Sequence, residues 1–172
     1  MLLFSCRSKT GEKTLFTLMD STGIQFVNTV HDTKELNILN YRNFYNGGGV
    51  AIGDINNDGL ADIFFTANQG SNKLYLNKGN LKFEDISDKA GFREKKQWST
   101  GVVMADINND GWLDIYVCNA GSMDDSSLRR NQLFINNYHL LNHHHQIFNK
   151  NYLLLNVFIT IQICQIQQQQ LL

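Results

Sequence analysis

The chain has 172 residues, a formal net charge of −1, and 42% hydrophobic and 18% charged residues. This length suffices for one domain with a hydrophobic core, and the near-neutral charge argues against nucleic acid or an anionic membrane as a partner. The three cysteines at positions 6, 118 and 164 are too far apart in sequence to indicate a disulfide framework or a CxxC metal site.

The N-terminus reads MLLFSC, in which Leu3, Phe4, Ser5 and Cys6 resemble the lipobox of bacterial lipoproteins. Signal cleavage at a lipobox leaves a lipid-modified cysteine. A secretory signal normally has a charged segment and about 7–15 apolar residues, yet only five residues precede Cys6. Two interpretations stay open. Either the start lies upstream and Cys6 carries a lipid anchor, or this is an ordinary apolar N-terminus.

A long internal repeat follows. GDINNDGLADIFF at residues 53–65 returns as ADINNDGWLDIYV at residues 105–117, and NKLYLN at 72–77 returns as NQLFIN at 131–136. The first unit predicts strands at residues 49–53, 62–67, 73–77 and 81–86, with a turn at 78–80. Only residues 33–39 and 89–96 suit a turn or two of helix. Four strands in roughly 50 residues are typical of a propeller blade, so we expect an all-β chain of about two four-stranded blades.

The acidic stretch of each unit has the form D-x-N-x-D-G-x-x-D, which offers oxygen atoms at positions 1, 3, 5, 7 and 9. Calcium (Ca²⁺) takes 6–8 oxygen ligands from carboxylates, amides, backbone carbonyls and water. The candidate ligands for about two ions are Asp54, Asn56, Asp58, the Leu60 carbonyl and Asp62, and Asp106, Asn108, Asp110, the Trp112 carbonyl and Asp114. Gly59 and Gly111 are expected at positive φ.

An EF-hand does not fit, because its twelfth position requires Glu and holds Phe65 or Val117 here. The remaining alternative is that Asn-Asp-Gly only forms a good β-turn. Two copies at equivalent places in a longer repeat favour the metal site over this alternative.

Residues 14–137 resemble the FG-GAP/VCBS repeat family, on the phrases FYNGGGVAIGDINNDGLADIFF, NKLYLNKGNLKFEDISDKAGF and WSTGVVMADINNDGWLDIYVCNAG. The family includes the blades of integrin alpha-subunit propellers and bacterial VCBS-repeat lipoproteins. The resemblance implies a seven-bladed propeller in full-length relatives, with calcium in loops between the first two strands of blades. By that matching, the ten loop positions named above are the metal site. Two blades cannot close such a ring.

Composition changes sharply near residue 137, since all 13 glycines and every Asp and Glu precede it. We therefore divide the chain into five segments. They are a lipobox-like segment and linker (1–13), a preceding outer strand and connector (14–47), the first blade (48–97), an incomplete second blade (98–137) and an irregular, non-family tail (138–172). A frame-shifted translation would explain the tail; a metal-binding tract at His139 and His143–His145 is the functional alternative.

These features favour a calcium-binding module for extracellular or cell-surface binding or scaffolding, with an unknown protein or glycan ligand. Loops at residues 68–72 and 121–130 are the natural contact surfaces, and attachment to a bacterial outer membrane would follow from the lipobox. No segment approaches the roughly 20 apolar residues of a membrane span. The alternatives are a truncated gene product without function and a part of a propeller enzyme. No GxSxG or HExxH motif supports catalysis, so we expect no enzyme.

Overall fold

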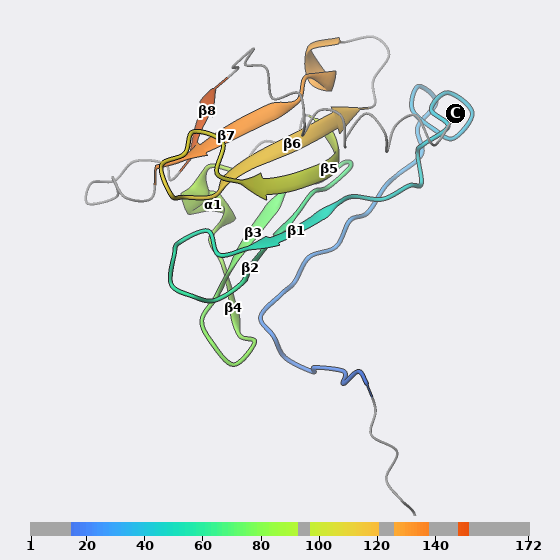
Figure 1. Ribbon diagram of the computed structural model, residues 1–172. Helices are drawn as coiled ribbons and strands as arrows, with labels where there is room; N and C mark the ends of the chain where they lie inside the picture. Colours follow the sequence, from blue (N-terminus) through green and yellow to red (C-terminus); the bar gives the residue numbers. More distant parts are fainter. Residues whose placement is uncertain (1–14, 93–96, 121–125, 138–147, 152–172) are drawn as a thin grey trace, which may run out of the picture.

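In the computed structural model, residues 15–92, 97–120, 126–137 and 148–151 are described, and they form two four-stranded antiparallel sheets (Figure 1). The order of the strands in each sheet follows their order in the chain. Each sheet is therefore a meander, as in a propeller blade. The prediction of an all-β chain with two four-stranded blades is confirmed.

The first sheet consists of β1 (Val50–Gly53), β2 (Asp62–Phe65), β3 (Lys73–Asn77) and β4 (Phe83–Asp85). Each of these strands lies inside the range that the repeat pattern predicts. The turn between β3 and β4 occupies residues 78–82, two residues more than the predicted 78–80, and Gly79 within it has a φ of 85°. Glycine adopts this conformation without the steric cost of a Cβ atom.

The second sheet consists of β5 (Trp98–Ala105), β6 (Asp114–Ala120), β7 (Gln132–Asn136) and β8 (Phe148–Asn151). A register shift between Ser99 and Val102 interrupts the pairing of β5 with β6. A short 3₁₀ helix, η1 (Ser126–Arg129), lies in the insertion that separates β6 from β7.

Strand β8 comes from the segment that was expected to be irregular. Of that segment the structure describes only residues 148–151, which pair with β7 from Asn136 opposite Phe148 to Leu133 opposite Asn151. Strand pairing uses backbone donors and acceptors that every residue but proline carries. For this reason the composition of the tail did not indicate a strand.

The helical content of the described residues is one α-helical turn and one 3₁₀ turn. Helix α1 (Ser87–Ala90) ends at Gly91, which has a left-handed φ of 93° and so acts as a typical C-cap. The predicted helical stretch at 89–96 overlaps only the end of α1, and residues 93–96 lie outside the described residues. Residues 33–39 form bends and turns instead of the predicted helix.

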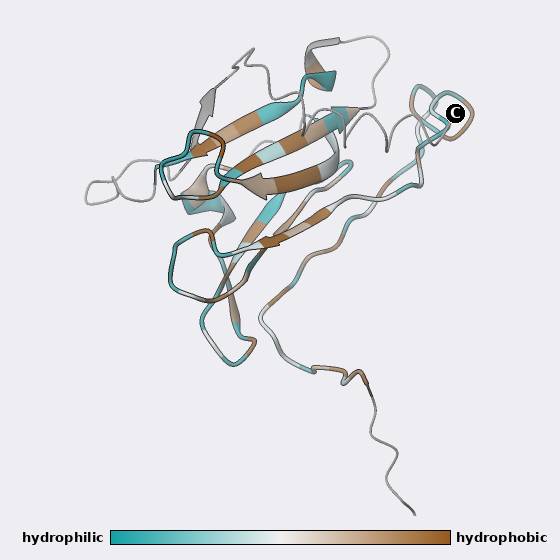
Figure 2. Ribbon diagram, viewed as in Figure 1, coloured by the Kyte–Doolittle hydropathy of each residue, from teal (hydrophilic) through white to brown (hydrophobic). Residues whose placement is uncertain are grey.

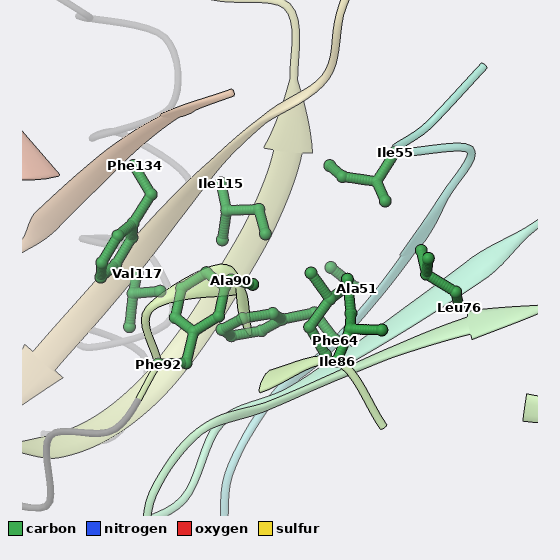
Figure 3. Packing of buried hydrophobic residues seen from close by; sticks show 11 residues of the cluster. Ala51, Ile55, Phe64, Leu76, Ile86, Ala90, Phe92, Ile115, Val117 and Phe134 are labelled. Carbon is green, nitrogen blue, oxygen red and sulfur yellow. The ribbon is translucent and has the colours of Figure 1, made fainter. Parts of the chain in front are cut away.

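The hydrophobic core lies between the two sheets (Figure 3). Side chains alternate between the faces of a strand, so Phe64 of β2 points into the core together with Ile115 and Val117 of β6, all three fully buried. Phe92 packs edge-to-face against both Phe64 and Phe134, with ring centroids 4.8 Å apart in each pair. Figure 2 shows hydrophobic residues concentrated on the strands. Each blade therefore depends on the other for burial of its core face.

Residues 15–32 run as an extended segment beside the first sheet (Figure 1). The Phe26 ring stacks on Phe65 of β2 at 4.8 Å, and Asn28 Nδ2 donates to Asn68 Oδ1 at 2.8 Å. Leu15 and Phe16, which precede these contacts, are 93% and 89% exposed. The Thr22 carbonyl accepts from the N–H of Phe83 in β4 at 2.7 Å, so the contacts of the segment with the first blade extend back to this residue.

Of the three cysteines, the structure describes Cys118 and neither Cys6 nor Cys164. Cys118 in β6 is buried and disulfide-bonded, which its spacing from the other cysteines did not indicate, because distance in sequence does not measure distance in space. Cys6, the candidate lipid-attachment residue, lies outside the described residues. Within those residues, no helix has the length and apolar character needed to cross a bilayer.

Candidate metal-binding loops

The two acidic loops occupy equivalent places in the two blades. Loop 1 (residues 54–61) connects β1 to β2, and loop 2 (residues 106–113) connects β5 to β6. Both loops emerge on the left in Figure 1. Asp62 and Asp114, the ninth residues of the two motifs, are the first residues of β2 and β6. The expected location between the first two strands of each blade is confirmed.

Loop 1 is closed by hydrogen bonds from its own backbone to its acidic side chains. Asp54 accepts from Asp58 N at 3.0 Å and from Gly59 N at 2.8 Å, and Asp58 Oδ1 accepts from Leu60 N at 2.9 Å. Asn56 contacts Asp58 twice, accepting from its N–H at 3.3 Å and donating to its Oδ2 at 2.9 Å. The three polar side chains at positions 1, 3 and 5 therefore gather around one turn of backbone.

Loop 2 repeats this arrangement. Asp106 accepts from Asp110 N at 3.1 Å and from Gly111 N at 2.9 Å, and Asp110 Oδ1 accepts from Trp112 N at 2.9 Å. Asn108 contacts Asp110 in the same two ways, at 3.2 and 2.9 Å. Each of these distances lies within 0.1 Å of its counterpart in loop 1.

Two residues of each loop have a left-handed backbone. Gly59 and Gly111 have φ values of 84° and 85°, as the sequence predicted. Asn57 and Asn109 also have positive φ, at 56° and 59°. Asparagine is one of the few non-glycine residues that tolerate this region. The asparagine that both repeats carry at the fourth position of the motif thus has a conformational reason.

The aspartates at position 9 hold the loops to the sheets. Asp62 is fully buried and accepts from Ile55 N at 2.9 Å and from Asn77 N at 2.7 Å. Asp114 is also fully buried and accepts from Ile107 N at 3.0 Å and from Asn136 N at 2.8 Å. Each carboxylate therefore joins the second residue of its loop to the end of the third strand.

Burial raises the pKa of Asp62, and the charges of Asp58 and Asp54 raise it further, while the N–H donors of Asn77 and Ile55 oppose the rise. The pKa of Asp114 is raised by the same causes, namely burial and the charges of Asp110 and Asp106. The three carboxylates of each loop are thus close enough to repel one another. A cation between them would remove this repulsion.

Sequence reasoning missed two asparagines that complete these sites. Asn77 Nδ2 donates to the Ala61 carbonyl at 3.1 Å, and Asn136 Nδ2 donates to the Leu113 carbonyl at 3.0 Å. In this way the end of the third strand fastens the residue just before each position-9 aspartate. The signal was present in the repeat, because both NKLYLN and NQLFIN end in asparagine.

The candidate metal ligands of each loop are all oxygen atoms, from three carboxylates, one side-chain amide and one backbone carbonyl. A carboxylate oxygen has about two acceptor sites, so the hydrogen bonds to backbone leave capacity for a cation. No group of three or more His, Cys, Asp or Glu side chains in the described part of the chain is arranged to hold a metal by itself. A bound ion would therefore need the amide, carbonyl or water oxygens as well, a mixture that suits calcium.

In the part of the chain that the structure describes, no basic side chain forms an ion pair with a loop carboxylate. The ion pairs among the described residues join Lys73 to Asp85, and Lys78 and Lys89 to Glu84, all in the first blade outside loop 1. Among the described residues, the loop carboxylates accept hydrogen bonds from backbone N–H groups and from the side chains of Asn56 and Asn108. Each loop therefore carries a net negative charge, because its motif has three aspartates and no basic residue.

The loops at residues 68–72 and 121–130, which the sequence suggested as contact surfaces for a ligand, differ from the acidic loops. Asn68 is 2% exposed and donates to the carbonyls of Gly47 and Ser99, so it holds the connector to both blades and is not a contact residue. Residues 121–125 of the other loop lie outside the described residues, as do His139 and His143–His145.

Residues 54–117 match the family described as FG-GAP-like repeat. The segment from the start of loop 1 to the core of β6 therefore contains both acidic loops. This match agrees with the repeat that is visible in the sequence and with the two equivalent blades.

Three vertebrate proteins are similar to part of this chain. Cartilage acidic protein 1 of Xenopus tropicalis is 43% identical over 74 residues, which is 42% of this chain and 11% of that protein. The mouse protein of the same name is 41% identical over 69 residues, and the human one 40% identical over 72 residues. The matched segment again spans only 11% of the length of each of these relatives.

Proposed function

Because residues 54–117 of this chain match the FG-GAP-like repeat family, we propose that the chain is a non-catalytic binding module whose two loops each hold a calcium ion. The observation that carries the proposal is the identical closed conformation of the loops, in which five pairs of hydrogen bonds agree to within 0.1 Å. A plain β-turn would not need the same set of acidic and amide oxygens twice.

In this proposal the ligands are the side chains of positions 1, 3, 5 and 9 and the carbonyl of position 7. They are Asp54, Asn56, Asp58, Leu60 and Asp62 in loop 1, and Asp106, Asn108, Asp110, Trp112 and Asp114 in loop 2. Calcium supplies positive charge where three carboxylates repel one another. The backbone N–H donors favour the closed conformation of the loop, and an ion bound to the carboxylates would hold it more firmly.

We place the module outside the cell or on its surface, where it binds an unidentified protein or glycan. Two features support this location. The relatives are named after cartilage, a tissue rich in extracellular matrix, and extracellular calcium modules bind at about 10⁻⁴–10⁻³ M, which requires millimolar calcium. A lipid anchor at Cys6 on a bacterial outer membrane is the finer form of the proposal, supported by the lipobox-like LFSC. Mass spectrometry of the Cys6 peptide tests it: a diacylglyceryl adduct supports the anchor, and an unmodified thiol contradicts it.

Calorimetric titration of the full chain with calcium tests the metal sites. We expect about two ions to bind, and we expect Asp54→Ala and Asp106→Ala each to remove one of them. Glu35→Ala is the matched control, because Glu35 is an exposed carboxylate outside both loops, and it should bind two ions. Circular dichroism shows that each sample is folded. A folded chain that gives no heat of binding would contradict the proposal and leave the loops as turns.

A further inference from the structure

The two loops contact each other across the boundary between the blades. Asn57 Nδ2 of loop 1 donates to the carbonyl of Gly111 in loop 2 at 3.0 Å. The N–H of the same Gly111 donates to Asp106 Oδ2 at 2.9 Å. The Asn57 side chain of loop 1 therefore helps to position Gly111, whose N–H binds the first aspartate of loop 2.

A second connection passes through the protein interior. Asn136, which is fully buried, donates from Nδ2 to the carbonyl of Ile55 in loop 1 at 2.8 Å. Its backbone N–H donates to Asp114 Oδ1 at 2.8 Å, and the N–H of Ile55 donates to Asp62 Oδ2 at 2.9 Å. A continuous path of hydrogen bonds thus joins the position-9 aspartates of both loops.

The equivalent residues make no such connection within the described part of the chain. Asn77, the counterpart of Asn136, donates from its side chain to Ala61 in its own blade. Asn109, the counterpart of Asn57, has nearly the same φ, but its side chain makes no hydrogen bond to loop 1 there. Of these four asparagines, Asn57 and Asn136 are therefore the two that face the other blade and connect the loops.

We propose that calcium binding at the two loops is positively coupled through Asn57 and Asn136. This inference rests on the proposed function and adds its regulation. An ion in loop 1 fixes the backbone of Ile55 and Asn57, and these residues then hold Asn136 and Gly111 in the positions that loop 2 requires. The second ion meets a loop that is already ordered, so it loses less conformational entropy on binding. Coupling of this kind is reciprocal between the two sites.

Tryptophan fluorescence provides a readout of the second site, because Trp112 lies in loop 2 whereas the other tryptophan, Trp98, lies at the opposite end of β5 from that loop. Calorimetry measures both sites. In the full chain, we expect Asp58→Ala in loop 1 to raise the calcium concentration that half-saturates the Trp112 signal by at least about five-fold. Asp110→Ala in loop 2 should weaken binding to loop 1 by the same factor. In an Asn57→Gly background, the effect of Asp58→Ala should be clearly smaller.

Asn109→Gly is the matched control for Asn57→Gly. Both substitutions replace an exposed asparagine at positive φ by the residue that tolerates this conformation best, and only Asn57 bridges the loops. The full coupling should survive Asn109→Gly. Two ions bound with affinities that do not change when the other loop is disabled would overturn the coupling but keep the calcium sites. The absence of any calcium binding to the folded wild-type chain would overturn both.

Discussion

Loop 1 and loop 2 have the same internal hydrogen bonds, but their surroundings differ. Their internal hydrogen bonds agree to within 0.1 Å, yet Ile55 of loop 1 is 2% exposed in the core between the sheets, whereas Ile107 of loop 2 is only partly buried. The repeat determines the conformation of each loop, and the position of the blade in the array determines what the loop contacts. In repeat proteins, stability is the sum of such intrinsic and nearest-neighbour contributions.

The largest effect should come from the core residue that faces the neighbouring blade. Phe64 and Tyr116 occupy the same repeat position, but Phe64 is fully buried against the second sheet and Tyr116 is partly exposed. We expect Phe64→Ala to lower the free energy of unfolding by about 3–5 kcal/mol because it leaves a cavity. Tyr116→Ala should cost less than half as much. Urea unfolding measures both, and equal costs would show that the two sheets do not share one core.

A smaller difference should separate the two asparagines that end the third strands. Asn136→Ala leaves the carbonyls of Ile55 and Leu113 without this donor, whereas Asn77→Ala leaves the Ala61 carbonyl and the Gly79 N–H without a partner. The bond from Asn136 to Ile55 is buried and both Asn77 bonds are only partly buried. An unsatisfied buried group costs about 1–3 kcal/mol, so Asn136→Ala should cost more than Asn77→Ala in urea unfolding. If Asn77→Ala proved the more damaging change, the bond between the blades would contribute little.

Removal of calcium should have a still smaller effect on each loop. At a free calcium concentration ten times the Kd, each occupied site stabilises the folded chain by about 1.4 kcal/mol. A chelator should therefore lower the unfolding midpoint of the wild-type chain, and it should lower that of Asp106→Ala by a smaller amount. An unfolding curve that is unchanged by the chelator would contradict calcium binding at both loops.

The smallest effect concerns an ion pair that only the first blade has. Lys73 Nζ lies 2.8 Å from Asp85 Oδ2, and the second blade has Gln132 in place of Lys73. Burial raises the pKa of Asp85, but hydrogen bonds from Lys73 and Ser87 outweigh it, so the pKa is lowered overall. A lowered pKa in the folded state stabilises the fold above the unfolded pKa, and this stabilisation is lost as the pH falls through the folded value.

Lys73→Gln copies the second blade and tests this pair. We expect a loss of about 0.2–1 kcal/mol at pH 7, as for other exposed pairs, and a difference from wild type that shrinks as Asp85 becomes protonated below about pH 4. Unfolding curves at both pH values measure it. A loss that stays the same in acid would mean that Lys73 acts through packing and not through its charge.

The sequence predicted the features that lie within one repeat. Strand β3 has its predicted bounds, both loops lie between the expected strands, and Gly59 and Gly111 have the positive φ that the motif requires. These features depend on residues close together in the chain, where turn chemistry and side-chain alternation act directly.

The features that join the repeats could not be predicted in this way. The contact of Asn57 with Gly111 spans 54 positions and that of Asn136 with Ile55 spans 81 positions. Both depend on how one sheet packs on the other, which the pattern of a single blade does not specify. Strand β8 was missed for a related reason, since its pairing with β7 uses backbone groups and needs no family motif.

Terbium luminescence provides the most direct test that these loops are calcium sites. Tb³⁺ occupies calcium sites and emits when a nearby tryptophan transfers energy to it, and loop 2 has Trp112 where loop 1 has Leu60. We expect sensitised emission that saturates, that calcium displaces, that Asp106→Ala abolishes and that Asp54→Ala retains. Emission that is absent from the folded chain, or that persists in Asp106→Ala, would contradict the assignment of loop 2 as a metal site.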